Sequence, residues 1–587
     1  SRDGQVSASL VKLKNAETID DLAAILGFKP SALAFIVYKL PASLKYRTFE
    51  IPKRTGGTRT ISAPDPRLKT LQKRLANVLY ACREEIDKTS GLPPLSHGFR
   101  KKHSIITNAR PHTRRRHVLN LDLQDFFPAF NFGRVRGFFL KNRHIALKEK
   151  IATLIAQIAC YNNELPQGSP CSPIISDLIA HPMDVRLAQL AKKHRLTYTR
   201  YADDLTFSTG QKQFPAAVAA PNPDALSRWL PGRELLAPIR KAGFVVHPDK
   251  TRMQFRVSRQ IVTGLTVNEK VNIRADYYWY VRVMCNSLFQ TGLYTRPASF
   301  NKSGNAAPIA SLAPLEGILS HIHYVKTVGA PGATPVDEAA EPPRQQQHKP
   351  PTGTRLLHKR FLMFRYFVCP DRPIIVCEGK TDNVYLSLAV RHLPQFQPRL
   401  GAPSGTQFQL AISFFSYRNE AHKILDLYGS ATWLKSFIET YPAQLQRFRH
   451  RPLVHPVIVL IDNDDGATEI FAMIKKRFNI AIDWTNRQPF YHLTNNLYLI
   501  KTVEGTGNGK SCIEDAFEQS VRDTVLDGKK FNPNKKHKAN GEYGKQIFAE
   551  KVVRANAAAI DFSGFTTVID RIVAAIDDYN QRKQRAA

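Results

Sequence analysis

Two adjacent aspartates stand between apolar residues at Tyr201-Ala202-Asp203-Asp204-Leu205. Because side chains alternate across a strand, adjacent carboxylates suit a tight hairpin turn better than a regular strand. A third carboxylate, Asp122, ends an apolar run that begins at Val118. Two Mg²⁺ ions about 3.5–4 Å apart, held by carboxylate oxygens, stabilise the attacking and leaving oxygens of phosphoryl transfer. The pattern predicts such a metal site, although an exposed acidic turn is the alternative for the Asp203-Asp204 pair alone.

Two apolar runs in the second half of the chain also end in carboxylates. Run 373–377 leads into Glu378, and run 457–461 leads into Asp462 and Asp464. Short, continuous apolar runs fit buried parallel strands, and ligand sites of α/β folds form beyond the carboxyl ends of such strands. We therefore expect a divalent-metal site at Glu378, Asp462 and Asp464. Glu514 is either a further ligand or a carboxylate on a helix surface.

The elements that position these carboxylates follow from apolar periodicity. The opening stretch predicts helices, with apolar faces that include Leu26 and Leu33. In the second half, the two apolar runs and the helical patterns between them predict an α/β layered domain. In the first half we expect a hairpin over 49–64 with its turn at Gly56-Gly57, and strands at 118–123, 198–202 and 205–208.

A segment with almost no large apolar side chains divides the chain. Residues 329–353 are rich in Pro, Ala and Gln. Such a composition cannot bury enough surface to offset the entropy of ordering. We therefore expect a linker at 329–353 between an N-terminal part, 1–328, and a C-terminal part, 354–587.

The composition points to a polyanionic partner. The chain has 84 Lys and Arg against 49 Asp and Glu, a formal net charge of +35. Such an excess attracts nucleic acid and also anionic membrane surfaces. No apolar run reaches the roughly 18 residues of a membrane-spanning helix, and the N-terminus lacks the apolar core of a signal peptide. The seven cysteines form no C-x-x-C pair, so they suggest neither a zinc knuckle nor a disulfide framework.

The motif order in the first half resembles that of the reverse transcriptases. Leu121 to Phe127 resembles the family's first carboxylate motif, Leu165 to Pro170 its template- and nucleotide-positioning loop, and Tyr201 to Asp204 its signature hairpin. Gly243 to Lys250 resembles the next motif, and Gly56 to Arg59 together with Pro64 to Lys69 resembles the fingers segment. The resemblance implies an α+β right-hand polymerase with fingers, palm and thumb, in which Asp122, Asp203 and Asp204 bind Mg²⁺.

The same resemblance implies residues that bind the nucleotide. Phe127 falls where the family places the aromatic ring that rejects ribonucleotides, although a core phenylalanine is the competing interpretation. Gln167 and Gly168 belong to the positioning loop, and Lys250 is the lysine near the nucleotide phosphates. Arg59 and Lys69 would neutralise triphosphate charge, or they are simply solvated.

Two further elements are similar to those of retron enzymes. Asn108 to His112 matches an N-A-x-x-H element, and Val262-Thr263-Gly264 matches a V-T-G element. A retron enzyme uses a cognate structured non-coding RNA as primer and template, consumes dNTPs, and leaves a branched RNA–DNA product (msDNA) that starts at a guanosine 2′-hydroxyl. The resemblance implies a bacterial, cytoplasmic protein with no membrane partner; an intron-type reverse transcriptase is the rival, and the oligomeric state is open. The residues expected to contact nucleic acid are Asn108, His112, Val262, Thr263 and Gly264, together with the basic cluster Arg114, Arg115 and Arg116.

The carboxylates of the second half resemble those of a Toprim domain, the α/β fold shared by topoisomerases, bacterial primases and overcoming-lysogenization-type nucleases. A topoisomerase needs a tyrosine nucleophile on a further large domain, and a bacterial-type primase usually carries a zinc module that the cysteine spacing does not provide. A metal-dependent nuclease remains, with Glu378, Asp462 and Asp464 as its metal ligands. Joined to a retron enzyme, it suggests an effector in anti-phage defence. A non-catalytic Toprim module that holds the RNA–DNA product is the alternative.

Overall fold

The structure of this chain is a computed structural model. It describes residues 9–53, 57–90, 93–297, 308–329, 353–405, 407–417, 419–505, 509–533 and 541–586, which form two compact units. The first unit holds the described residues up to Tyr278 and those from Tyr324 to Gly329. The second holds the described residues from Trp279 to His323 and from Gly353 onward. The linker expected at 329–353 lies almost entirely outside the described residues.

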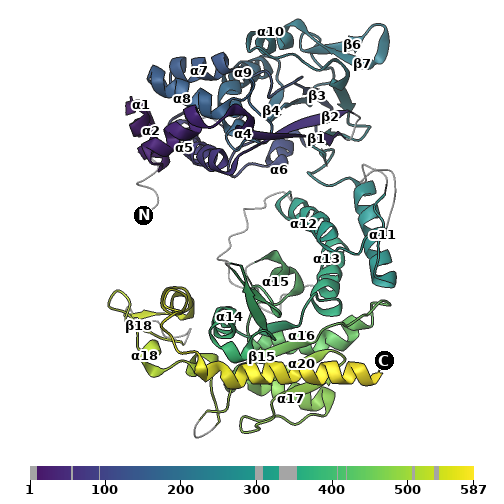
Figure 1. Cartoon of the computed structure of the whole chain (residues 1–587). Helices are drawn as coiled ribbons and strands as arrows, with labels where there is room; N and C mark the ends of the chain where they lie inside the picture. Colours follow the sequence, from purple (N-terminus) through teal and green to yellow (C-terminus); the bar gives the residue numbers. More distant parts are fainter. Residues whose placement is uncertain are drawn as a thin grey trace. The chain divides into compact units, whose positions relative to one another are not determined.

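The first unit combines helices with small antiparallel sheets (Figure 1). Its helices are α1 (Ser9–Asn15), α2 (Ile19–Leu26), α3 (Pro30–Ala34), η2 (Phe35–Lys39), α4 (Ala42–Lys45), α5 (Pro66–Ser90), α6 (Ile105–Ala109), η3 (Arg110–His112), α7 (Phe132–Lys141), α8 (Glu149–Ala159), α9 (Ser172–Lys193), α10 (Arg233–Lys241) and η4 (Pro248–Lys250). Its strands are β1 (Tyr46–Pro52), β2 (Thr58–Pro64), β3 (His117–Asp122), β4 (Thr197–Tyr201), β5 (Asp204–Thr209), β6 (Ala219–Asn222), β7 (Ala225–Pro231), β8 (Arg252–Phe255), β9 (Ile261–Val262) and β10 (Leu265–Thr266).

A four-stranded sheet in the order β4-β5-β3-β8 lies at the centre of the first unit. All of its pairings are antiparallel, and β3 pairs with β5 from His117 opposite Thr209 to Asp122 opposite Asp204. The sheet shares one apolar core with α5, α8 and α9, which includes Leu119, Leu205 and Phe207. The strands predicted at 118–123, 198–202 and 205–208 are confirmed to within one residue at each end.

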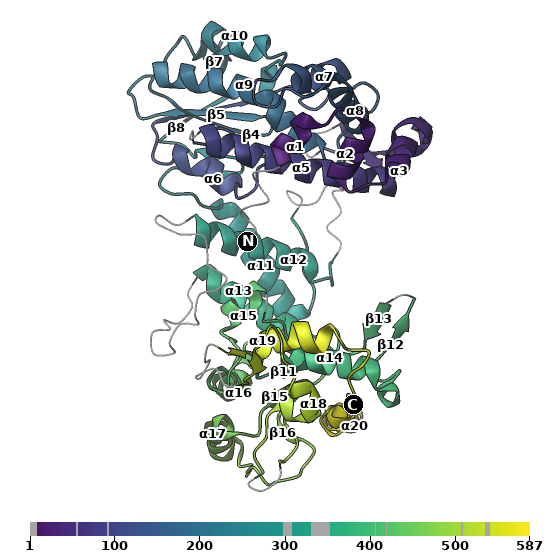
Figure 2. The same ribbon diagram turned by 90° about the vertical axis from the view of Figure 1, so that its left-hand side faces the viewer.

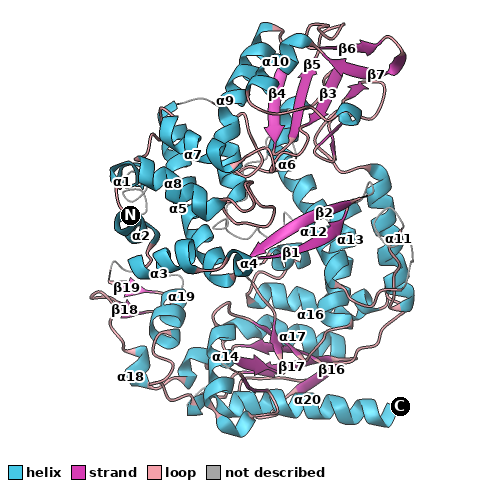
Figure 3. Ribbon diagram, turned by 45° about the horizontal axis from the view of Figure 1, so that its top comes forward, coloured by secondary structure: helices cyan, strands magenta, loops and turns pink. Residues whose placement is uncertain are grey.

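The hairpin predicted over 49–64 is also confirmed. Strands β1 and β2 pair antiparallel from Tyr46 opposite Pro64 to Pro52 opposite Thr58, and they form a long ribbon in Figure 3. The expected turn residue Gly56 lies outside the described residues, whereas Gly57 adopts φ of +76°. The opening stretch is helical as predicted, and Leu26 and Leu33 are buried in the core.

The second unit is built on a five-stranded sheet (Figure 2). Its helices are the greater part of α11 (Ala275–Thr291) and of α12 (Ala313–Val328), then α13 (Gly353–Met363), η7 (Phe364–Val368), α14 (Asp382–His392), η8 (Pro394–Phe396), α15 (Glu420–Leu425), α16 (Ala431–Leu445), η9 (Asp465–Ala467), α17 (Thr468–Phe478), η10 (Ile513–Ala516), α18 (Gln519–Arg522), α19 (Lys545–Ile547), η11 (Phe548–Arg554), η12 (Ser563–Phe565) and α20 (Thr566–Ala586). Its strands are β11 (Ile374–Cys377), β12 (Gly401–Ser404), β13 (Gln407–Leu410), β14 (Ser413–Phe414), β15 (Val457–Ile461), β16 (Tyr491–Thr494), β17 (Leu497–Lys501), β18 (Lys530–Phe531) and β19 (Glu542–Tyr543).

The strand order in this sheet is β14-β11-β15-β17-β16. Strand β11 pairs parallel with β14 and β15, β15 pairs parallel with β17, and only the edge strand β16 runs antiparallel to its neighbour. The side chains of β11 and β15 are all buried. Those of Ile375, Ile458 and Leu460 share a core with α14 and α20. The two apolar runs are therefore buried parallel strands of an α/β layered domain, as predicted.

The compact units do not divide at the linker. Most of α11, from Trp279, and most of α12, up to His323, group with the second unit rather than with the first. The domain boundaries expected from the sequence, 1–328 and 354–587, stay a prediction. No single described helix is long and apolar enough to cross a membrane, while the bent pair Ile19–Leu26 and Pro30–Lys39 passes that test of length and composition when its two helices are taken together.

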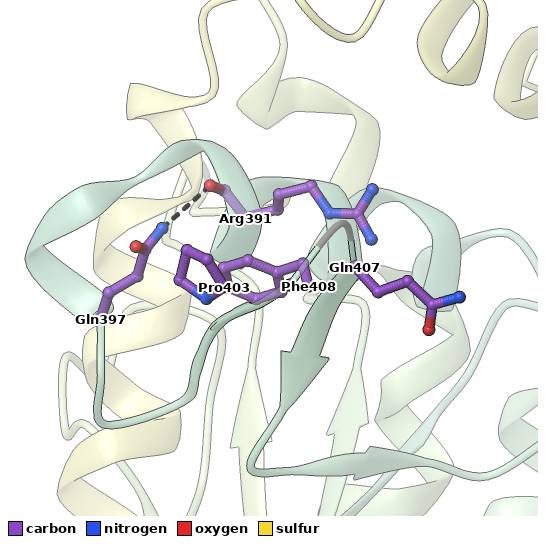
Figure 4. A pocket seen from close by; sticks show the side chains of 6 residues that line it. Arg391, Gln397, Pro403, Gln407 and Phe408 are labelled. Carbon is purple, nitrogen blue, oxygen red and sulfur yellow. Dashed lines mark hydrogen bonds between the residues drawn. The ribbon is translucent and has the colours of Figure 1, made fainter.

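The second unit has an open pocket of about 550 Å³ between the end of α14 and the β12–β13 hairpin (Figure 4). The Arg391 guanidinium lies over the Phe408 ring, 5.5 Å from its centroid, and Gln397 Nε2 donates to the Arg391 carbonyl oxygen at 3.0 Å. The described lining has no carboxylate. The described lining therefore lacks the charged oxygen ligands that Mg²⁺ sites of proteins usually contain.

Candidate active sites

The predicted Asp203-Asp204 turn is a tight hairpin. Tyr201 of β4 pairs with Asp204 of β5, so the turn consists of Ala202 and Asp203 alone. Ala202 adopts φ of +56°, a left-handed conformation that costs a non-glycine residue free energy and needs support from its surroundings. The turn thus presents two consecutive carboxylates at one end of the central sheet.

Asp122 reaches the same end of the sheet from β3. The register places Asp122 directly opposite Asp204, and the Leu123 amide donates to the Asp203 carbonyl oxygen at 2.9 Å. Because the antiparallel ladder fixes this register, the three predicted metal ligands are brought together by backbone pairing.

Burial, and after it the charge of neighbouring carboxylates, raises the pKa of Asp203 and Asp204. Burial raises the pKa of Asp203, and the nearby Asp122 charge raises it further. Loss of surrounding water raises the pKa of Asp204 to about 7, with added repulsion from Asp203 and Asp122, although the Asp204 side chain still reaches solvent. A bound cation would relieve this repulsion.

Two of the predicted basic residues lie against this cluster. Lys250 Nζ forms an ion pair with Asp122 Oδ1 at 2.8 Å, and its charge lowers the pKa of both Asp203 and Asp204. Arg59, exposed on β2, also lowers the pKa of Asp203. Lys69 is exposed on the first turn of α5.

The positioning loop packs against the fingers hairpin. Ser62 of β2 donates its amide to the Gln167 carbonyl oxygen at 2.8 Å. Gly168 adopts φ of +123°, and a Cβ there would lie 2.6 Å from the Ser62 carbonyl oxygen. Only glycine therefore allows this approach. Phe127 is half-buried, with its ring 5.6 Å from Phe126 and 5.9 Å from Phe99 between centroids.

The donor chemistry at the turn fits Mg²⁺. Asp122, Asp203 and Asp204 supply carboxylate oxygens, which hard cations prefer. Among the described residues, no three His, Cys, Asp or Glu side chains converge closely enough to hold a metal ion as they stand. Carboxylates of like charge repel one another, and Lys250 holds Asp122 in an ion pair. Metal binding would therefore require a small closure of the carboxylates and release of Lys250.

The second acidic cluster lies at the carboxyl ends of β11 and β15. Glu378 follows β11, Asp462 follows β15, and the strands pair in parallel with Cys377 opposite Leu460. The Asp462 amide donates to Glu378 Oε2 at 3.1 Å. Asn463 between the two aspartates is fully buried, and its Nδ2 donates to the carbonyl oxygens of Trp484 at 2.9 Å and Gly509 at 2.6 Å. The alternation of side chains leaves Asp462 and Asp464 on the opposite side from Asn463, toward Glu378.

Three further charged residues complete this cluster. Asp382, in the first turn of α14, is 2% exposed and accepts the Gly379 amide at 2.7 Å. Glu514 is 1% exposed, so it is not a surface carboxylate, and Lys545 Nζ donates to it at 2.9 Å. The spacing Glu378-x-x-x-Asp382, in which a short turn leads from the end of β11 to the start of α14, could have revealed Asp382. Nothing in the sequence pattern indicates Lys545.

The charge of this cluster is only partly balanced. Burial raises the pKa of Asp382 to about 7, with Glu514 adding to the rise, and burial with the charges of Asp382 and Glu378 raises the pKa of Asp462. Burial opposes the charged form of Lys545, but Glu514 and Asp462 outweigh it and raise the pKa of the ammonium. Asp382 Oδ1 and Glu514 Oε1 are buried with no hydrogen-bond partner among the described residues. These orphaned oxygens fit a divalent cation.

Comparison with known proteins assigns the first of these sites to a family. Residues 51–272 match the family described as reverse transcriptase (RNA-dependent DNA polymerase). The chain is 32% identical over 275 residues to the retron Ec86 reverse transcriptase of Escherichia coli, an alignment that covers 46% of this chain and 78% of that protein. The chain belongs to the retron reverse transcriptase family.

Two relatives from Myxococcus xanthus are more similar to this chain than the Escherichia coli enzyme is, but the alignment covers a smaller share of each. The retron Mx65 reverse transcriptase is 36% identical over 46% of this chain and 62% of its own length, and the retron Mx162 reverse transcriptase is 35% identical over 44% and 54%. The chain thus spans less than two thirds of these two relatives. The family match ends at residue 272, so the second acidic cluster lies outside it.

The two retron-type elements pack against each other behind the Asp203-Asp204 hairpin. Thr263 Oγ1 donates to the Ile105 carbonyl oxygen at 3.2 Å, joining the β9–β10 turn to α6. His112 is fully buried, its two ring nitrogens 2.7 Å from Ser208 Oγ and 2.8 Å from Thr199 Oγ1 on β5 and β4. Asn108 and Val262 are also 0% exposed.

Burial changes what the predicted nucleic-acid contacts can do. Asn108, His112 and Val262 cannot touch nucleic acid in this conformation, because their side chains are enclosed by protein. Gly264 at the turn tip, Arg114 and Arg116 are exposed, and Arg115 is half-buried. These four, with half-buried Thr263, are the members of the predicted set that a nucleic acid can reach.

Because His112 is held neutral, it makes stability depend on pH. Burial lowers the pKa of His112 to about 3, against about 6.5 in an unfolded chain. Its stabilising contribution is full above pH 6.5 and is lost as the pH falls, because the unfolded chain gains a proton that the folded chain cannot. His112→Phe removes the partner of the buried Ser208 Oγ and leaves Thr199 Oγ1 with only its 3.5 Å bond to the Asn108 carbonyl oxygen, so it should cost about 1–3 kcal/mol at pH 7.5.

The free-energy gap between wild type and His112→Phe should shrink by up to about 1.4 kcal/mol per pH unit below pH 6.5. Urea unfolding of both proteins at pH 7.5 and pH 5.5 measures this gap. A gap that stays constant over this range would show that His112 is not held neutral by burial.

Proposed function

We propose that this protein is an RNA-directed DNA polymerase that copies a cognate structured non-coding RNA into a branched RNA–DNA product (msDNA). The observation that carries the proposal is the register that sets Asp122 opposite Asp204, with Asp203 beside them in a two-residue turn. The family match over 51–272 and the net charge of +35 support it. An intron-type reverse transcriptase is the alternative, which membership of the retron family disfavours.

The chain's own residues supply binding and orientation in this reaction. Asp122, Asp203 and Asp204 would hold Mg²⁺, which stabilises the charge that develops on the attacking and leaving oxygens. Lys250 and Arg59 lie where they can balance the triphosphate of an incoming dNTP. The contact of the Gln167 carbonyl with β2 fixes the positioning loop to the fingers hairpin.

We further propose that the α/β unit is a Toprim-type, metal-dependent nuclease that acts as an effector in anti-phage defence. Its support is that Glu378 and Asp462 follow adjacent parallel strands, with the Asp462 amide bonded to Glu378 and Asp464 two residues further on. The two orphaned oxygens of Asp382 and Glu514 extend the cluster and favour a working metal site over a module that only holds the RNA–DNA product. Here again a bound divalent ion would polarise the scissile phosphate.

The role of the RNA, the cellular location and the domain boundaries belong to the same proposal. The RNA serves as both primer and template, and the protein works in the bacterial cytoplasm with no membrane partner. The proposed domains are the polymerase at 1–328, the linker at 329–353 and the Toprim domain at 354–587. The nucleic acid that the nuclease cuts, and the signal that triggers it, are left open.

Isosteric changes at the two acidic clusters should separate two activities. Asp203→Asn removes a metal ligand and should lower RNA-templated incorporation of dNTPs by about a hundredfold or more. Glu378→Gln and Asp462→Asn should leave that incorporation within about twofold of wild type. The same two variants should lose Mg²⁺- or Mn²⁺-dependent cleavage of a panel of single-stranded DNA, duplex DNA and RNA, together with any toxicity on expression.

Matched controls are Asp224→Asn, an exposed aspartate of the β6–β7 turn, and Glu439→Gln on the exposed side of α16. Both should behave as wild type in both assays. If all three cluster variants lose DNA synthesis equally, the chain does not contain two separate sites. If Glu378→Gln and wild type are equally inactive as nucleases and equally harmless to cells, the non-catalytic module becomes the better account.

Removal of the Phe127 ring should relax sugar selection. The half-buried ring lies five residues beyond Asp122 and packs edge-on against Phe126. A ring beneath the sugar leaves no room for a 2′-hydroxyl, so Phe127→Ala should raise the ratio of ribonucleotide to deoxyribonucleotide kcat/KM by about tenfold or more. Phe99→Ala, which removes a ring that packs against Phe127, is the control. Equal loss of both activities in Phe127→Ala, with no change in the ratio, would identify Phe127 as a core residue.

A further inference from the structure

Directly before the catalytic turn, Arg200 is fully buried. It lies on β4, two residues from Ala202, with 0% of its side chain exposed. Burial of a guanidinium costs several kcal/mol unless it is paired and hydrogen-bonded. We therefore expect Arg200 to have a structural role, which its hydrogen-bond partners should show.

The carboxylate partners of Arg200 come from a single helix, α9. Its Nε and Nη2 donate to Asp184 Oδ1 and Oδ2, both at 2.7 Å, in a two-pronged pairing. Its Nη2 also donates to Asp177 Oδ1 at 3.0 Å, and Tyr198 OH donates to Asp184 at 2.8 Å. Asp177 and Asp184 are both fully buried. Helix α9 follows the Gln167–Gly168 loop closely, so the pairing joins that loop's helix to β4.

The remaining bond of the guanidinium reaches the turn itself. Arg200 Nη1 donates to the carbonyl oxygen of Ala202 at 3.0 Å. Ala202 is the residue with φ of +56°. The planar guanidinium therefore ties the strained residue of the turn to two carboxylates that are themselves held rigidly in the core.

A second element supports the turn from another side. His97 donates its amide to the Arg200 carbonyl oxygen at 2.8 Å, and the Arg200 amide donates to the Leu95 carbonyl oxygen at 2.9 Å. Gly98 follows at once, and a Cβ on it would lie 2.5 Å from the Ala202 amide nitrogen. No other residue fits at position 98 unless the turn moves, so the turn is confined on both sides.

We propose that Arg200 is a positioning residue that holds the Ala202-Asp203 turn in its left-handed conformation, so that Asp203 and Asp204 face Asp122. An apolar core could stabilise the fold as well as a buried ion cluster. Such an apolar core could not donate the hydrogen bond that Arg200 makes to the Ala202 carbonyl oxygen. This inference rests on the proposed polymerase function for its kinetic consequence, but its structural part stands by itself.

Four variants test the proposal. Arg200→Lys keeps the charge and loses the planar fork. Arg200→Met combined with Asp177→Asn and Asp184→Asn removes the buried charges together, so that no carboxylate is left unpaired. Gly98→Ala places a Cβ against the Ala202 amide and leaves Arg200, Asp177 and Asp184 unchanged. Gln72→Leu is the control, because Gln72 is buried in the same unit and bonded to Tyr46 and Ile158, with no hydrogen bond to the turn.

Two measurements distinguish positioning from general stability. Hydrogen exchange of the peptide that spans 198–207 reports the turn directly, without metal or substrate. Arg200→Lys, the triple variant and Gly98→Ala should exchange about tenfold faster there than wild type, and Gln72→Leu should not. In primer extension, the first three should need about fivefold more Mg²⁺ for half-maximal rate and show a lower kcat, while KM for dNTP stays within about twofold.

Exchange at 198–207 that matches wild type in Arg200→Lys and in the triple variant would overturn the proposal. So would activity that falls only in proportion to the folded fraction, with an unchanged Mg²⁺ requirement. If wild type extends no primer on any RNA, the polymerase proposal fails, yet the exchange measurement still decides whether Arg200 holds the turn.

Discussion

Repulsion between carboxylates at strand ends is the constraint on which the rest of this protein depends. Burial raises the pKa of both Asp203 and Asp204, and repulsion adds to it: Asp122 raises the pKa of Asp203, and Asp203 and Asp122 raise that of Asp204. A chain keeps such a group only where strong local structure opposes the repulsion. Here the antiparallel register and a two-residue turn provide that structure, and Lys250 supplies part of the missing positive charge.

The second unit meets the same constraint with a different geometry. Parallel strands β11 and β15 end at one edge of a sheet that is buried on both faces, so Glu378 and Asp462 emerge together. The short turn after β11 brings Asp382, the first residue of α14, back to that edge, and Lys545 balances Glu514 from a distant part of the chain. The two clusters thus reach similar donor chemistry through backbone pairing of opposite sense.

The parts of these sites that lie close together in sequence could be predicted, and the parts that depend on distant segments could not. The hairpin at Asp203 and the buried strands before Glu378 and Asp462 follow from local pattern. The burial of Asn108 and His112 depends on how α6 and η3 pack against β4 and β5, and a short motif does not record that. Lys545 reaches its cluster only through tertiary packing, so no spacing in the sequence points to it. The grouping of α11 with the second unit is likewise a property of packing alone.

The central claim is that the carboxylate cluster at the Asp203 turn builds DNA on an RNA bound to this same protein. The most direct test is to purify the protein from cells that carry its native locus and to sequence the nucleic acid that accompanies it. The account predicts a small branched RNA–DNA hybrid that is lost in Asp203→Ala, while the RNA alone remains bound. Intron RNA, or RNA with no attached DNA in the wild type, would contradict it.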